Sequence, residues 1–179
     1  MEEIRSRRSL LKAAGSLIAL AMLPLPALAR MRGVRQLSFF HTHTSEKLTV
    51  VYADNGAYVP EALSEINHLL RDFRNDAVHP IDPRLLDILH AVRERTGSGG
   101  HFEVISGFRS PATNDMLRHN SNGVARNSMH LRGQAIDVRL TGTSTRNVRR
   151  VAIAMAQGGV GYYPESDFVH LDTGRVRTW

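Results

Sequence analysis

Apolar residues in this chain recur with the spacing of β-strands in some segments and with the spacing of helices in others. The order of these segments is the feature that most limits how the chain can fold. The apolar runs Leu37 to Phe40 and Leu48 to Tyr52, joined by a polar turn, predict a β-hairpin. Further strands are predicted over residues 101–108, 134–140, 159–163 and 168–172, and helices over residues 60–75, 83–92, 111–119 and 145–157. We therefore expect one α+β domain, in which a mostly antiparallel sheet carries helices packed on one side.

The N-terminal segment has a different character from the rest of the chain. Arg7 and Arg8 precede an apolar run from Ala13 to Leu25, and Ala27-Leu28-Ala29 follows it, which is the pattern of a signal peptide. A membrane anchor is the alternative, but the apolar run is shorter than the roughly 20 residues that span a bilayer. The paired arginines indicate the twin-arginine export route. We expect residues 1–29 to be this signal and residues 30–179 to form a periplasmic domain with no membrane span.

The chain is basic, with 23 Lys and Arg against 17 Asp and Glu and a formal net charge of +6. Removal of residues 1–29 takes away four basic and two acidic residues, which leaves 19 against 15 and a net charge of +4. A basic surface suits an anionic polymer, of which nucleic acid is the usual example. An exported protein meets peptidoglycan instead, and the basic residues here are scattered along the sequence. A solvated surface with no specific partner is the alternative.

Two histidines and an aspartate are the candidate metal ligands. His130 lies in the loop before the predicted strand 134–140, Asp137 lies on that strand, and His170 lies on the last predicted strand, so the three side chains can converge. Gly133 permits a sharp turn between the first two. Three protein ligands with a fourth position left to water are typical of catalytic zinc. The spacing by itself leaves open that these are solvated or hydrogen-bonded side chains.

Other chemistries have less support in the sequence. His41 and His43 form a rival pair, since alternate residues of a strand point to one face, but no third ligand accompanies them. Polar residues in a hairpin turn often serve solubility alone. The absence of cysteine excludes a thiol nucleophile and a lipid anchor, and no G-x-S-x-G element supports a serine nucleophile.

Three motifs together carry a resemblance to a known family. They are "SGFRS" at 106–110, "GVARNSMHLRGQAID" at 123–137 and "GVGYYPESDFVHLDTG" at 159–174. The chain resembles the zinc D-alanyl-D-alanine peptidase superfamily of bacterial cell-wall enzymes, which shares its metal site with the hedgehog signalling domain. Within that superfamily it is most similar to periplasmic murein endopeptidases of the YcbK/MepK type. The resemblance implies a hedgehog/DD-peptidase-like fold.

The resemblance also implies roles for single residues. The zinc ligands of the family fall on His130, Asp137 and His170. Arg109 falls on the active-site arginine, where a fixed positive charge would polarise the scissile carbonyl and stabilise the developing oxyanion. Ser128 either contacts the substrate or braces its loop.

Proton transfer is where the sequence departs from the family. Asp167 stands three residues before His170, where the superfamily has a glutamate or a histidine that handles the proton. The shorter side chain leaves open whether Asp167 acts directly, acts through a second water, or is a solvated turn residue. Asp172, two residues after His170, is expected to orient that histidine through its other ring nitrogen.

These residues predict a zinc metallopeptidase that hydrolyses amide bonds with metal-activated water. The resemblance implies the peptide stems of peptidoglycan as substrate, and in particular the L,D bond between two diaminopimelate residues. A D-Ala-D-Ala carboxypeptidase would use the same site. A non-catalytic zinc-containing cell-wall-binding protein is a further alternative, which the departure at Asp167 favours. The expected partners are peptidoglycan and the twin-arginine export machinery, with no nucleic acid.

Overall fold

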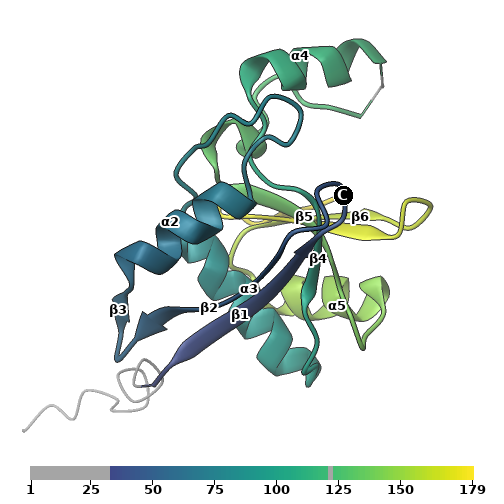
Figure 1. Ribbon diagram of the computed structural model, residues 1–179. Helices are drawn as coiled ribbons and strands as arrows, with labels where there is room; N and C mark the ends of the chain where they lie inside the picture. The colour runs from purple at the N-terminus through teal and green to yellow at the C-terminus, as the bar shows by residue number, and fades with distance from the viewer. Residues whose placement is uncertain (1–32, 121–122) are drawn as a thin grey trace, which may run out of the picture.

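A single eight-stranded sheet organises residues 33–120 and 123–179, the part of the chain that the computed structural model describes (Figure 1). Its strand order is β3-β2-β1-β4-β5-β7-β6-β8. Only the pairs β1·β4 and β6·β8 are parallel, so the predicted, mostly antiparallel sheet is confirmed. The strands are β1 (Arg35–His41), β2 (Lys47–Asp54), β3 (Ala57–Tyr58), β4 (Phe102–Ser106), β5 (Ala135–Leu140), β6 (Gly159–Tyr163), β7 (Phe168–Asp172) and β8 (Arg177–Thr178).

Helices cover one face of this sheet and enclose the hydrophobic core. The elements are α2 (Pro60–Leu69), α3 (Pro83–Thr96), α4 (Pro111–Asn120), the 3₁₀ helix η1 (Met129–Arg132) and α5 (Thr145–Met155). Helices α2, α3 and α5 contact the strands, whereas α4 projects beyond the end of the sheet (Figure 1). The predicted α+β arrangement, with helices packed on one side, is therefore confirmed.

Strand β5 shows how the two faces of the sheet differ. Ile136, Val138 and Leu140 are buried in the core against the helices, because alternate side chains of a strand point to the same face. Asp137, which alternates with them, faces the other way. The helix-covered face thus supplies stability, and the opposite face is available for polar side chains.

Helix α3, predicted over residues 83–92, extends to Thr96 and is capped at both ends. The Asp82 side chain accepts a hydrogen bond from the backbone nitrogen of Arg84 at 3.0 Å, and Pro83 occupies the first turn. Gly97 ends the helix in the left-handed conformation with φ of 69°.

The end of α2 differs from the prediction. Helical spacing predicted a helix to residue 75, but α2 ends at Leu69. Asp72 is buried instead, and its carboxylate accepts hydrogen bonds from the backbone nitrogens of Ser110 at 2.9 Å and Arg74 at 3.1 Å. The contact with Ser110 is 38 positions away in the sequence and outweighs the local helical pattern.

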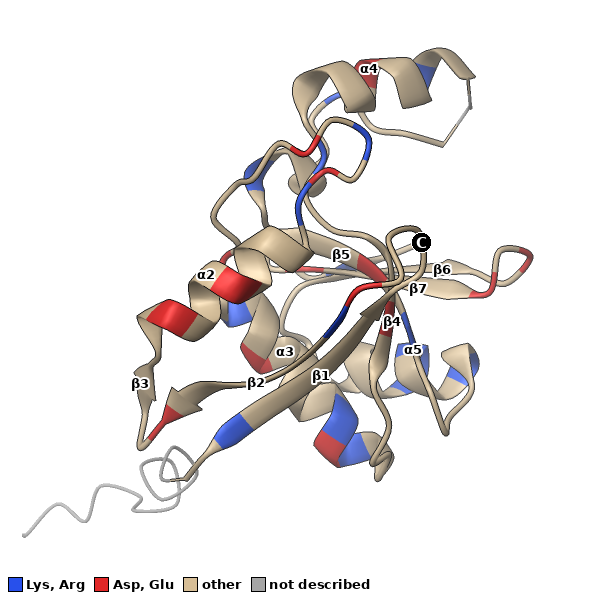
Figure 2. Cartoon of the chain, viewed as in Figure 1, with Lys and Arg blue, Asp and Glu red and all other residues tan. Residues whose placement is uncertain are grey.

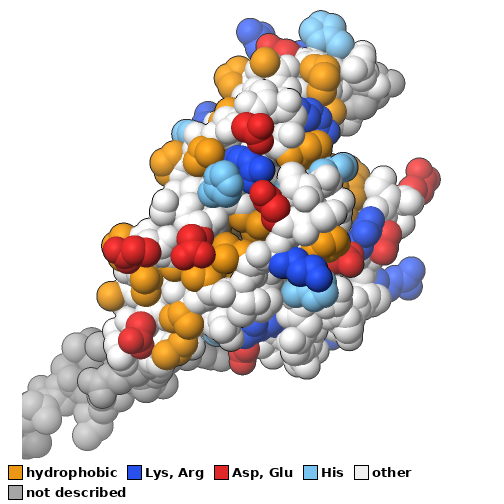
Figure 3. Space-filling model, in the orientation of Figure 1, with side chains coloured by type: hydrophobic (Ala, Val, Ile, Leu, Met, Phe, Trp, Pro, Cys, Tyr) orange, Lys and Arg blue, Asp and Glu red, His pale blue; other side chains and the backbone are white. Residues whose placement is uncertain are grey.

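Charged residues are spread over many elements of the fold. Lys and Arg occur on β1, α3, α5 and several loops, while acidic side chains mark α2 (Figure 2). In the space-filling view, basic, acidic and hydrophobic side chains intermingle on the visible face (Figure 3). This face therefore lacks the continuous basic stripe that nucleic-acid binding would favour.

None of the helices in the described residues is long and apolar enough to cross a membrane. The predicted signal peptide, residues 1–29 with Arg7 and Arg8, lies outside the described residues.

Candidate metal centre and active site

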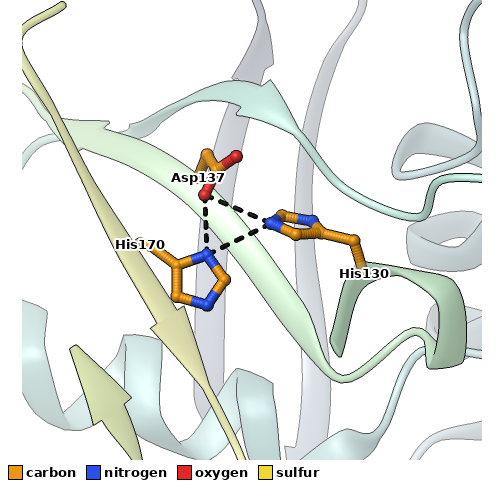
Figure 4. Close-up of side chains that lie close together, drawn as sticks. All are labelled: His130, Asp137 and His170. Atoms are coloured by element: carbon orange, nitrogen blue, oxygen red, sulfur yellow. Dashed lines mark hydrogen bonds and ion pairs between the residues drawn. The ribbon is translucent and has the colours of Figure 1, made fainter. Parts of the chain in front are cut away.

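His130, Asp137 and His170 meet on the face of the sheet away from the helices (Figure 4). Asp137 on β5 and His170 on β7 are directly paired in the antiparallel ladder, so their side chains leave the same face side by side. His130 Nε2 lies 3.2 Å from Asp137 Oδ1 and 3.1 Å from His170 Nδ1. His170 Nδ1 lies 2.9 Å from Asp137 Oδ1. The structure brings together the three predicted ligands.

The far nitrogen of each ring is held by an acceptor. His130 Nδ1 lies 2.7 Å from the carbonyl oxygen of Gly107, and His170 Nε2 lies 3.0 Å from Asp172 Oδ2. Since a carbonyl and a carboxylate only accept, these far nitrogens carry the ring protons. In the neutral rings, the two nitrogens that face Asp137 therefore present lone pairs. Two nitrogen lone pairs and a carboxylate oxygen converge on one point, and a cation is what such a donor set suits.

The electrostatics of the group fit this reading. Burial would raise the pKa of Asp137, but the positive charge of His130 and the hydrogen bonds of both histidines, which the rings supply when protonated, hold that pKa well below its usual range. Burial lowers the pKa of His130, against the pull of Asp137. Burial also acts to lower the pKa of His170, but its hydrogen bonds to Asp137 and Asp172 outweigh this and raise the pKa. The carboxylate is thus anionic at neutral pH, and at His170 a proton competes with a metal ion.

Local structure explains why His130 can reach the other two ligands. Ser128 caps η1, and its Oγ accepts a hydrogen bond from the backbone nitrogen of His130 at 3.3 Å. Gly133 ends η1 with φ of 63°, and a Cβ built there would stand 2.2 Å from the carbonyl oxygen of Pro80. Only glycine fits this close approach, as the predicted turn required. Ser128 therefore braces the loop, which is one of the two roles considered for it.

A bulge in β4 brings Arg109 to the candidate metal ligands. The register between β4 and β5 shifts between Val104 and Ser106, so that Ser106 stands opposite Asp137 and on the same face. Arg109 Nε donates to Ser106 Oγ at 2.8 Å, and Arg109 Nη2 donates to Asp137 Oδ2. The predicted active-site arginine thus touches a candidate metal ligand.

A second carboxylate orders the surroundings of His170. Besides the ring nitrogen of His170, Asp172 accepts hydrogen bonds from both terminal nitrogens of Arg177, at 3.0 and 2.7 Å, and from the backbone nitrogen of Gly159 at 3.1 Å. Burial would raise the pKa of Asp172, but the hydrogen bonds from His170 and Arg177 hold it well below its usual range. The predicted contact between Asp172 and His170 is present.

Asp167 is placed differently from the other predicted site residues. Its Oδ1 accepts a hydrogen bond from the Thr145 hydroxyl at 2.7 Å, at the start of α5, and its Oδ2 lies 3.7 Å from Arg139 Nε. Asp167 has a φ of 49°, so it also serves the turn between β6 and β7. The geometry does not bring its carboxylate to the three ligands and gives the predicted role in proton transfer no support.

The three ligands line a cleft of about 680 Å³. Sequence reasoning had included Arg109 and Ser128 in this region, but it missed Tyr163, Arg175, Arg177 and Trp179, which also line the cleft. The one sequence signal that would have indicated them is Gly159-x-Gly161 on a predicted strand. Two glycines on the same face leave room for side chains from another element.

Comparisons with known proteins identify the family of this chain. A family model described as "Peptidoglycan L,D-endopeptidase MepK" matches residues 29–179. The chain is 41% identical over 176 residues to the peptidoglycan L,D-endopeptidase MepK of Escherichia coli strain K12, and the match covers 97% of each chain. It is 38% identical over 178 residues to the probable peptidoglycan L,D-endopeptidase MepK of Haemophilus influenzae, covering 98% of this chain and 96% of that one.

Among solved structures, the vancomycin-resistance D,D-dipeptidase VanXYg matches 57% of this chain and 54% of its own, with 18% identity and a TM-score of 0.34. The family assignment rests on the sequence matches, which span nearly the whole chain. The chain belongs to the peptidase family described as peptidoglycan L,D-endopeptidase MepK.

Proposed function

We propose that this protein is a zinc-dependent peptidoglycan hydrolase that cleaves murein peptide cross-links at the L,D bond between two diaminopimelate residues. The names of the family and of its relatives support the substrate and the reaction. The observation that carries the proposal is the convergence of His130, Asp137 and His170. The far ring nitrogens of the two histidines already donate hydrogen bonds. In the neutral rings, the near nitrogens therefore present lone pairs toward the carboxylate of Asp137.

The residues present fit a zinc ion. His130 and His170 would supply nitrogen and Asp137 oxygen, and three protein ligands of this kind are characteristic of catalytic zinc sites. When bound there, zinc lowers the pKa of a coordinated water and polarises a substrate carbonyl. Gly107 and Asp172 fix the protons on the far side of the rings and so keep both ligands in the form that binds metal.

Arg109 is the residue that we assign to charge stabilisation. Its guanidinium is a planar, positively charged group that is held by Ser106 and Asp137. A fixed donor at this place can bind the oxygen of the scissile carbonyl as negative charge develops on it. Ser128 supports the site by holding the loop of His130.

Asp167 is the residue predicted to accept the proton. Asp167 stays a prediction from its position in the sequence, and in this structure it would have to leave Thr145 before its carboxylate approached the ligands. Among the described residues that line the cleft, Asp137 is the only one with a carboxylate side chain, and it is a candidate ligand itself.

Digestion of purified muropeptides tests the proposed activity. Muropeptides that are cross-linked through two diaminopimelate residues should yield uncross-linked products by mass, and a chelator should stop the reaction. Release of D-alanine from stems ending in D-Ala-D-Ala would establish the carboxypeptidase instead. Binding to sacculi without any cleavage, at full zinc content, would establish the non-catalytic alternative.

We also propose that residues 1–29 are a twin-arginine signal and that residues 30–179 act in the periplasm. The pair Arg7-Arg8 and the following apolar run support this. Changing both arginines to lysine should leave precursor in the cytoplasm. Normal periplasmic amounts of that variant would point to the general secretory route.

A further inference from the structure

The C-terminal segment extends the site face beyond the metal ligands. Strand β8 pairs with β6 in parallel, with Arg177 opposite Gly159. The backbone nitrogen of Trp179 donates to the carbonyl of Val160 at 3.2 Å, and the Tyr162 nitrogen donates to the Trp179 oxygen at 3.0 Å. The backbone nitrogen and the backbone oxygen of Trp179 are therefore both bound to β6.

The ring of Trp179 is fixed as firmly as its backbone. Its Nε1 donates to the Tyr163 hydroxyl at 3.0 Å, the Arg177 guanidinium lies 4.8 Å from the ring centroid, and the His170 ring lies 5.2 Å away. Beneath the ring is Gly161, where a Cβ would stand 2.7 Å from Trp179 Cε2. The strand thus leaves a space that the tryptophan occupies.

This fixed ring is nevertheless 48% exposed and lines the cleft that holds the metal ligands. A rigid aromatic surface that stays open within a cleft is suited to contact with a ligand. The open side of Trp179 is therefore a candidate substrate surface beside His170.

The charges of the cleft point to an anionic ligand. Its lining contains three arginines, Arg109, Arg175 and Arg177, and one carboxylate, Asp137. Arg109 pairs with Asp137, and Arg177 pairs with Asp172 through two hydrogen bonds. No residue within 33–120 or 123–179 pairs with the exposed guanidinium of Arg175. Arg175 is thus the cation of the cleft that is available to a substrate.

The loop that carries Arg175 is held in place. The backbone nitrogen of Gly174 donates to Asp172 Oδ1 at 2.8 Å, and Arg177 Nη1 donates to the carbonyl of Arg175 at 3.1 Å. Asp172, which orients His170, therefore also orders the backbone on both sides of Arg175.

The proposed substrate has a carboxylate and an aliphatic chain that match Arg175 and Trp179. When the side-chain amine of one diaminopimelate forms the cross-link, the carbon that bears this nitrogen keeps a free carboxylate, and an aliphatic chain continues from it. We propose that Arg175 binds this carboxylate and that Trp179 packs against the aliphatic chain, so that together they form the subsite for the amine side of the scissile bond. This inference rests on the proposed function, because the group bound here is the diaminopimelate whose amine is released when the cross-link is cleaved.

A matched pair of synthetic cross-linked peptides tests the subsite. One keeps the carboxylate and the other has a primary carboxamide in its place. Calorimetry with the His130→Ala variant, which should not turn over, measures affinity without cleavage. We expect the carboxylate peptide to bind about tenfold more tightly, as for a charge-assisted hydrogen bond. Arg175→Gln should remove this preference, and Arg146→Gln, an exposed arginine on α5, should keep it.

Trp179 provides an independent readout, since it is the only tryptophan in the sequence. Saturating peptide should change its fluorescence emission, and unchanged emission would overturn the proposed contact with Trp179. Equal affinity for the two peptides would overturn the role of Arg175.

Kinetics with the wild-type protein separate this inference from the function beneath it. We expect kcat/KM to favour the carboxylate peptide about tenfold, mainly through KM, and Arg175→Gln to abolish the difference. Cleavage of both peptides at equal kcat/KM would overturn the subsite and leave hydrolysis standing. Cleavage of neither, with the binding preference intact, would overturn the proposed function and leave the subsite as a binding site.

Discussion

Two pairs of histidines in this protein, His130 with His170 and His41 with His43, differ in what their ring nitrogens contact. His130 and His170 have their far nitrogens bound to acceptors, and their near nitrogens meet a carboxylate. His41 instead uses Nδ1 to accept hydrogen bonds from the backbone nitrogens of His43 at 3.3 Å and Thr44 at 3.4 Å. Its lone pair is therefore already occupied.

The partner of His41 also differs from a metal ligand. The His43 ring stacks on Phe73 with 4.1 Å between centroids. Burial, followed by the nearby charge of His43, lowers the pKa of His41 to about 4. The difference teaches that a histidine pair becomes a candidate metal site through what holds the far nitrogens, and not through spacing or burial alone.

The largest expected effect is on bound zinc, and it distinguishes the pair His130 and His170 from the pair His41 and His43. His130→Ala should reduce bound zinc from about one per chain to background and abolish hydrolysis, because two remaining ligands rarely retain zinc. His41→Ala should keep its zinc as long as it folds. Metal analysis of protein purified without chelator measures both. Zinc retained by His130→Ala, or lost from folded His41→Ala, would break the comparison.

Arg109→Lys tests whether a positive charge beside the candidate ligands is sufficient for turnover. Lysine keeps the charge and loses the planar fork that holds Ser106 and Asp137, so we expect turnover to fall about 10²-fold with zinc retained. Steady-state kinetics together with metal analysis measure this. Turnover near the wild-type value would show that the oxyanion is stabilised elsewhere.

Asp172→Asn tests the role of the carboxylate that binds the far ring nitrogen, Nε2, of His170. Asparagine can still accept from His170, but it loses the charge that supports the ring proton and pairs with Arg177. We expect zinc affinity to fall about 10- to 100-fold. Competition with a chromophoric chelator gives the affinity, and an unchanged value would show that this carboxylate serves only the fold.

Asp167→Asn provides the contrast in the turn that precedes the same strand, β7. This carboxylate contacts Thr145 and not the ring of His170, so we expect kcat to change by less than about threefold, whereas a general base contributes about 10²-fold or more. A loss of 10²-fold with normal zinc content would establish Asp167 as the proton acceptor that its sequence position suggested.

The smallest effect concerns stability and not metal. The folded pKa of His41 is about 4 and the ordinary value is 6.5, so between these pH values the unfolded chain binds the extra proton. The contribution of neutral His41 is present above pH 6.5 and is lost as the pH falls toward 4. Thermal melts should therefore show a steeper fall in Tm from pH 7 to pH 5 for the wild type than for His41→Asn. Parallel curves would contradict the low pKa.

The sequence by itself indicated the order of strands and helices and, through the motifs, the candidate ligand set and Arg109. These features depend on residues that are close in the chain or on a family pattern, so local rules reach them. Two-residue strands such as β3 and β8 have no period to detect, and the sequence missed both.

Only the tertiary structure decided how these residues work together. It ended α2 at Leu69, shifted Ser106 beside Asp137, turned Asp167 toward Thr145 and placed Trp179 over Gly161. The acceptor that holds the proton of His130 is the carbonyl of Gly107, 23 positions earlier in the chain. Such hydrogen-bond partners are set when strands and loops pack, because buried polar groups form hydrogen bonds with the groups that the fold brings near them.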